Sequence, residues 1–111
     1  MNFNEETIKT LINQVLADLK LSYFEDKEFV IRYDEEDEDA KEYGIKKTWL
    51  CFVKTHNWQF DTNEGVYSFH IDDNEPHHIL LIDGSGGRTP FFILKKDSNN
   101  KYYRAEIAQK K

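Results

Sequence analysis

The sequence predicts an α+β fold in which one N-terminal amphipathic helix packs on a curved antiparallel sheet of about five or six strands. Three observations lead to this prediction. Apolar residues near the N-terminus recur at helical spacing, the rest of the chain holds short β-branched and aromatic stretches between polar turns, and no second helical period of similar length follows. Because the apolar stripe of a single helix needs cover, the sheet is its expected partner.

The helix is expected from about Glu5 to Lys20. Asn4 before it is a suitable N-cap, and Glu5 and Glu6 place negative charge where the helix dipole favours it. The apolar side chains follow the i, i+3, i+4, i+7, i+8, i+11 spacing of one helical face; they are Ile8, Leu11, Ile12, Val15, Leu16 and Leu19.

The strands are expected in short apolar stretches that are bounded by polar turns. In residues 45–55 large apolar side chains alternate onto both faces, which is typical of a central strand. Turns are expected where Gly, Asp, Asn and Pro gather between these stretches. The expected strands cover residues 28–33, 45–55, 66–71, 77–83, 91–94 and 102–107, with a further alternating stretch at Trp58 and Phe60.

Length and composition bound the class of protein. A chain of 111 residues with 14% aromatic residues is expected to fold as one domain, residues 1–111. There is no long apolar run, and the first residues lack both the basic start and the apolar core of a signal peptide, so a cytoplasmic location is expected. The single cysteine, Cys51, excludes an internal disulfide and agrees with a reducing compartment.

The formal charge is concentrated in one stretch, which we call the acidic run (Asp34–Glu42). It carries seven carboxylates and one ammonium group, a local charge of −6, and the remaining fourteen acidic and fourteen basic residues cancel. Such a segment attracts a basic partner, and the alternative is a solvated loop that keeps the domain soluble. Because phosphate binding needs a basic face, nucleic acid is not expected as a partner, and neither is a membrane.

The acidic run can stay extended or form one helical turn through Ala40 to Tyr43 that Gly44 stops. Both forms are expected to project the charges into water. Tyr43 beside the run is a candidate aromatic anchor for a partner. The candidate partner-binding residues are Asp34, Glu35, Glu36, Asp37, Glu38, Asp39, Glu42 and Tyr43.

No motif for catalysis, metal or cofactor is found. His77 and His78 are neighbours that point to opposite faces of a strand, and neither His56 nor His70 has a partner at zinc-site spacing. Cys51 lies on an apolar strand face, where a thiol is generally inert. We therefore expect no catalytic residues, no metal and no cofactor.

A second interpretation is a small-ligand-binding or enzymatic α+β domain with a pocket between helix and sheet. Aromatic and polar side chains on neighbouring strands are its candidate lining. These are Trp58, Asp61, Tyr67 and His70. Such a domain is expected to have a cavity with convergent polar groups, whereas a binding protein would use its exposed acidic surface.

Two stretches resemble the YrhB-type immunity proteins of bacterial polymorphic toxin systems. One is Trp49-Leu50-Cys51-Phe52, and the other is Gly87-Arg88-Thr89-Pro90-Phe91-Phe92-Ile93 followed by Lys96-Asp97-Ser98. The acidic run and the region from Trp58 to Ile71 depart from that family's pattern. The resemblance implies a cytoplasmic α+β protein that neutralises a cognate toxin by binding it, without catalysis of its own.

Overall fold

The computed structural model describes residues 3–35, 37–56, 64–75, 78–86 and 90–107. The helices are α1 (Glu5–Asp18) and the short α2 (Glu38–Lys41). The strands are β1 (Val30–Asp34), β2 (Thr48–His56), β3 (Glu64–Asp72), β4 (Ile79–Gly84), β5 (Phe91–Lys96) and β6 (Tyr102–Ile107). The stretch at Trp58 and Phe60 lies outside the described residues.

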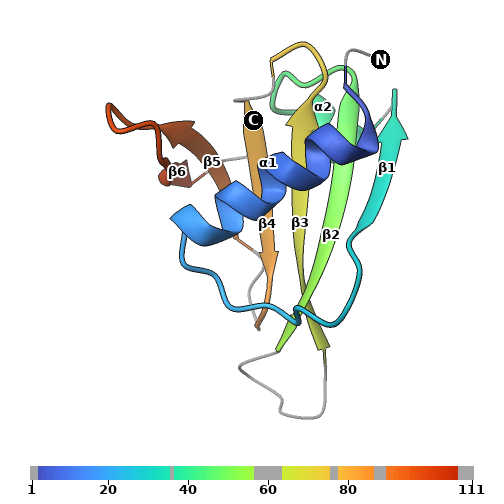
Figure 1. Cartoon of the computed structure of the whole chain (residues 1–111). Coiled ribbons are helices and arrows are strands. Elements are labelled where there is room, and N and C mark those ends of the chain that lie inside the picture. Colours follow the sequence, from blue (N-terminus) through green and yellow to red (C-terminus); the bar gives the residue numbers. More distant parts are fainter. Residues whose placement is uncertain (1–2, 36, 57–63, 76–77, 87–89, 108–111) are drawn as a thin grey trace.

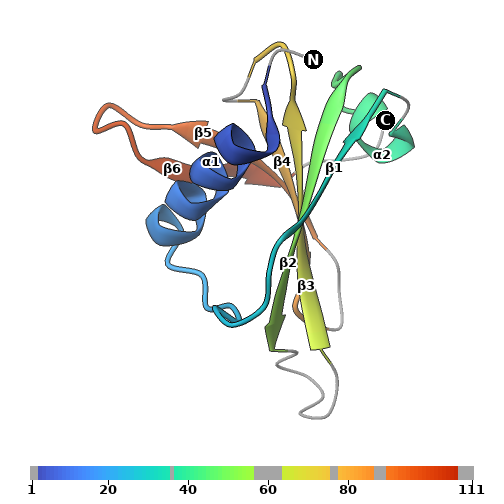
Figure 2. The same ribbon diagram turned by 45° about the vertical axis from the view of Figure 1, so that its right-hand side comes forward.

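The six strands form one antiparallel sheet in the order β1-β2-β3-β4-β5-β6, so each strand pairs with its neighbour in the sequence. Figure 1 shows α1 crossing one face of this curved sheet. In Figure 2, α2 lies beyond β1 and β2, on the side away from α1. The α+β fold predicted from the sequence is confirmed.

Helix α1 begins as expected but ends two residues early. The side chain of Asn4 accepts a hydrogen bond from the backbone N–H of Thr7 at 2.9 Å, which satisfies one free donor of the first turn. At the other end Lys20 takes a left-handed conformation with φ of 55°. The backbone N–H groups of Lys20 and Leu21 then donate back to Ala17 and Leu16, which is a Schellman motif without the usual glycine.

The main core lies between α1 and the sheet face that α1 covers, which we call the first face. Helix α1 contributes the predicted stripe, and β2, β3 and β4 contribute every second residue, as the two-residue period of strands requires. The buried members of this core are Ile8, Ile12, Val15, Leu16, Trp49, Cys51, Val53, Tyr67, Phe69, Ile71, Ile79, Leu81, Leu94 and Tyr102.

The opposite sheet face, the second face, has a smaller core of its own. Leu50, His70, Leu80 and Ile93 occupy neighbouring positions across β2, β3, β4 and β5. Ala40 from α2 and Ile45 pack with Leu80 into a second buried cluster. The predicted apolar residues on both faces of the central strands therefore have partners on both sides.

The hairpin of β5 and β6 is fastened to the C-terminal half of α1. The carboxylate of Asp18 accepts the backbone N–H of Tyr102 at 3.1 Å, and the amide of Gln14 donates to the backbone oxygen of Asn100 at 3.4 Å. These contacts join residues more than eighty positions apart in the sequence. They hold the hairpin beside α1, where a groove forms between them.

Candidate functional site

The acidic run is folded onto the sheet. Asp34 closes β1 and pairs with Thr48 of β2, and α2 follows directly. Of the two forms considered for the run, the helical one is present, but α2 begins and ends two residues before the expected turn from Ala40 to Tyr43. Gly44 beyond it has φ of +86°, a conformation that glycine adopts without strain. Glu36 lies outside the described residues, as does the side chain of Asp39.

Asp37 anchors the run to the second face. One oxygen of its carboxylate, Oδ2, lies 2.5 Å from Nδ1 of His70 and also accepts the backbone N–H of Ala40 at 3.3 Å, which caps α2. The side chain of His70 is 4% exposed and that of Asp37 is 14% exposed. The expectation that the whole run projects into water is therefore wrong for Asp37, because the fold places a buried imidazole beneath it.

The imidazole of His70 uses one of its two nitrogens for this contact. An ionised carboxylate only accepts hydrogen bonds, so Nδ1 of His70 carries the hydrogen that Asp37 receives. Among the described residues, the buried Nε2 atom has no hydrogen-bond partner. The contact with Asp37 is thus the polar interaction that compensates for burying His70.

Apolar contacts hold the rest of the segment in place. Ala40 and Ile45 are fully buried, and the ring of Tyr43 lies 5.9 Å from that of Phe91, at an interplanar angle of 49°. Tyr43 is half-buried, so one side of its ring packs on β5. The predicted anchor residue therefore packs partly on the sheet, beside the acidic run.

Among the carboxylates of the acidic run whose side chains the structure describes, those of Glu35, Glu38 and Glu42 are exposed. They lie on the β1–α2 connection and on α2 itself, which Asp37 and Ala40 fasten to the sheet. Because their backbone is fixed, these charges are presented in a defined arrangement. A basic partner would meet them without first ordering a loop.

Of the residues proposed for a pocket between helix and sheet, the two that the structure describes, Tyr67 and His70, do not come together. Tyr67 lies on the first face beneath α1, whereas His70 lies on the second face beneath α2. Their positions in β3 differ by three, and side chains an odd number of residues apart in a strand point to opposite faces. Trp58 and Asp61 lie outside the described residues.

Sequence reasoning missed a buried carboxylate, that of Asp73, which follows β3. Asp73 is 1% exposed, and its Oδ1 accepts the indole N–H of Trp49 at 2.8 Å and the backbone N–H of Phe3 at 3.3 Å. Burial of the Tyr33 hydroxyl, together with the negative charges of Asp73 and Glu35, raises the pKa of Tyr33. The one signal in the sequence that could have indicated this carboxylate was Trp49, because a buried indole N–H needs a hydrogen-bond acceptor.

Cys51 lies in the first-face core and is fully buried. Burial raises the pKa of its thiol from 9.0 to about 12, so at neutral pH it is a protonated thiol and a poor nucleophile. In the described part of the chain, no three His, Cys, Asp or Glu side chains are grouped so that they could hold a metal ion. Nor does that part contain a helix with the length and apolar character needed to cross a membrane.

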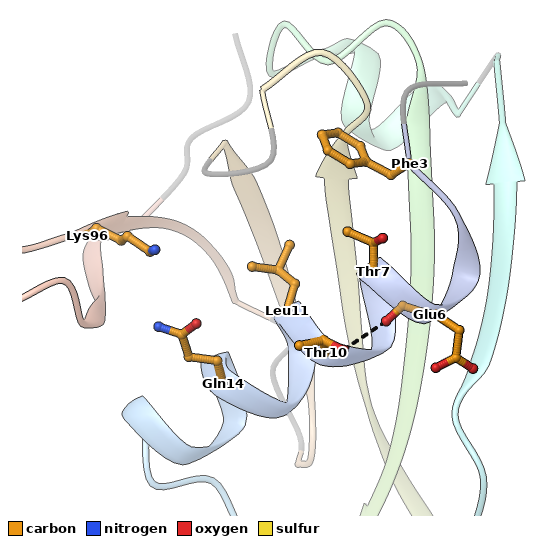
Figure 3. A pocket seen from close by; sticks show the side chains of 7 residues that line it. All are labelled: Phe3, Glu6, Thr7, Thr10, Leu11, Gln14 and Lys96. Atoms are coloured by element: carbon orange, nitrogen blue, oxygen red, sulfur yellow. Dashed lines mark hydrogen bonds between the residues drawn. The ribbon is translucent and has the colours of Figure 1, made fainter.

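A groove of about 500 Å³ runs along α1 on the side of the β5–β6 hairpin. Figure 3 shows its lining, in which α1 supplies one wall and Lys96 reaches across from the end of β5. The seven lining residues are Phe3, Glu6, Thr7, Thr10, Leu11, Gln14 and Lys96.

Comparisons of the chain with protein-family models, with curated proteins and with solved structures give no match.

Proposed function

We propose that this protein is a non-enzymatic binding module, an immunity-type inhibitor that neutralises a cognate toxin by placing its acidic surface against a basic cleft. The observation that carries the proposal is the anchoring of the acidic run. The carboxylate of Asp37 bonds to the buried imidazole of His70, so the segment that bears Glu35, Glu38 and Glu42 is held against the sheet. A solvated loop kept only for solubility would not need such an anchor.

The chemistry of the surface suits this role. Exposed carboxylates attract a basic partner from a distance and raise the rate of association, while fixed positions reduce the entropy lost on binding. Tyr43, held against Phe91, supplies the aromatic contact that tight interfaces usually contain. A toxin that acts on nucleic acid needs a basic cleft, and an acidic surface in that cleft would exclude its substrate.

The experiment that tests the proposal compares two triple variants of equal charge change. In the first, Glu35, Glu38 and Glu42 become glutamine, which leaves the anchor at Asp37 intact. In the control, the exposed residues Glu5, Glu25 and Glu28 become glutamine instead. Each protein is used to capture partners from the native host, and captured proteins are identified and tested for toxicity when expressed alone.

We expect the wild type and the control triple to capture one basic partner, to suppress its toxicity on co-expression, and to bind it more weakly as salt rises. The first triple should lose at least about tenfold in affinity, because three charges at one interface are removed. Equal retention by both triples would show that the acidic surface is not the binding surface. A captured protein without toxicity would contradict the immunity role but not the binding role.

A further inference from the structure

The groove beside α1 lies away from the acidic run. It opens on the side of the first face, whereas α2 lies on the second face. It is bounded by the outer side of α1 and by the end of β5 (Figure 3). A volume of about 500 Å³ falls within the range of small-molecule sites.

The floor of the groove is apolar and rigid. Leu11 and Phe3 line it and at the same time pack against the first-face core. Their positions are therefore set by the core, so an apolar ligand would meet a preformed surface. From Thr7 to Gln14 the helix rises by roughly 10 Å, which gives the groove an elongated shape.

The hydroxyl and amide groups of the helix wall are already engaged with the protein. The hydroxyl of Thr7 donates to Asn4 at 3.0 Å, and that of Thr10 donates to the backbone oxygen of Glu6 at 3.0 Å. The amide of Gln14 donates to Asp18 at 3.5 Å and to Asn100. These side chains thus have few donors left for a ligand.

Lys96 contributes a cation to the lining of the groove. Its ammonium group lies over the ring of Tyr102, 5.0 Å from the centroid, and forms no ion pair within the part of the chain that the structure describes. Lys96 and Tyr102 are directly opposite each other on β5 and β6, which places the ring within reach of the ammonium group. Figure 3 shows the ammonium pointing toward α1.

The charges of the groove differ between its two ends. Lys96 places a cation near Gln14, whereas the exposed carboxylate of Glu6 lies toward the other end of the lining. An anionic head group is attracted to the first end and repelled from the second. The groove is thus electrostatically oriented as well as elongated.

We propose that this groove binds an elongated amphiphile with a carboxylate head group, held by Lys96, and an apolar chain that lies over Leu11 and Phe3. The ligand class follows from one available cation at the end of an apolar floor. The site is independent of the proposed immunity role. Tyr67 and His70, which were considered from the sequence for a different pocket, are not among its described lining residues.

The test uses decanoate as the probe and 1-decanol as its uncharged counterpart, with binding followed by amide chemical shifts of the full-length protein. Decanoate should shift residues of α1 between Glu6 and Gln14 and residues near Lys96, and should bind at least about fivefold more tightly than 1-decanol. Lys96→Gln should weaken decanoate binding about fivefold, which is the effect expected from the loss of one partly exposed ion pair.

Lys95→Gln is the matched control, because Lys95 is exposed and precedes Lys96 on the opposite side of β5. It should leave the affinity unchanged, while Leu11→Glu should abolish binding and Glu6→Gln should tighten it about twofold. Each variant is first shown to retain the wild-type amide spectrum outside the groove, and Lys96→Gln carries the test if Leu11→Glu unfolds.

Three results would overturn the proposal. The first is equal affinity for decanoate and 1-decanol, and the second is an equal loss in Lys95→Gln and Lys96→Gln. The third is an absence of decanoate-induced shifts at the groove. If an extended acidic peptide shifts these residues where decanoate does not, the groove is a protein-docking site and the assignment to an amphiphile is wrong.

Discussion

The contact between Asp37 and His70 has a stability effect that can be worked out from the structure. In Asp37→Ala, α2 loses its N-cap, which is worth about 1 kcal/mol. The buried imidazole of His70 loses its partner at 2.5 Å, and a hydrogen bond to a charged group contributes about 1.5 to 3 kcal/mol. We therefore expect the free energy of unfolding to fall by about 2.5 to 4 kcal/mol.

The assay is equilibrium unfolding in urea, followed by tryptophan fluorescence, at neutral pH. Asp37→Asn should lie between the wild type and Asp37→Ala, because asparagine also caps helices but carries no charge. Glu38→Ala is the control, since Glu38 is exposed and its loss should change stability by no more than about 0.5 kcal/mol.

A double-mutant cycle with His70→Leu separates the effect of the Asp37–His70 contact from the effect of Asp37 as the N-cap of α2. The coupling between Asp37→Ala and His70→Leu should exceed about 1 kcal/mol, whereas residues that do not interact show couplings below about 0.5 kcal/mol. If Asp37→Ala lies within about 0.5 kcal/mol of the wild type, or if the coupling is absent, the anchoring of the acidic run is refuted.

Three further predictions concern the first-face core and the end of α1. Lys20→Gly should raise the free energy of unfolding by about 0.5 to 1 kcal/mol in urea, because Lys20 has φ of 55° and glycine adopts this conformation without strain. Lys9→Gly is the control within the helix, where glycine should lower the free energy of unfolding. Trp49→Phe should lower it by about 1 to 3 kcal/mol, because the buried Asp73 loses the indole donor; unfolding of this variant and of the wild type is followed by circular dichroism, since the substitution removes a tryptophan. The third concerns pH. Burial raises the pKa of the Cys51 thiol from 9.0 to about 12, so the unfolded chain loses this proton at lower pH than the folded protein does. The contribution of the thiol to the free energy of unfolding is therefore intact below pH 9 and is lost as the pH rises toward 12. Urea midpoints of unfolding measured from pH 9 to pH 12 should fall less steeply with pH in Cys51→Val than in the wild type. Equal slopes would contradict the raised pKa of Cys51.

Much of the fold could be predicted because its signals are local. The stripe of α1 and the alternation along β2 and β3 each depend on residues within one element, and the physical period of helix or strand translates them directly into a buried face. The early end of α1 could not be predicted, because Lys20 does not favour the left-handed conformation that it adopts. That conformation is stabilised by the return hydrogen bond from Leu21 to Leu16.

The candidate site was less accessible to prediction, because its contacts join distant parts of the chain. Asp37 and His70 are 33 residues apart, and their contact depends on how the β1–β2 connection folds over the second face. The composition of the acidic run showed its charge but not which carboxylate turns inward. The groove likewise depends on where the β5–β6 hairpin lies against α1, and the position of Lys96 in the sequence carries no sign of it.

The strand order has a consequence for how the protein forms during synthesis. Because every strand pairs with the one before it, the sheet can extend as the chain leaves the ribosome, with little loop-closure entropy at each step. Helix α1 is made first, yet its closing contact, from Asp18 to Tyr102, is 84 residues away. Its apolar stripe therefore stays without full cover until almost the last strand has emerged, and we expect the nascent chain to be most prone to aggregation in that interval.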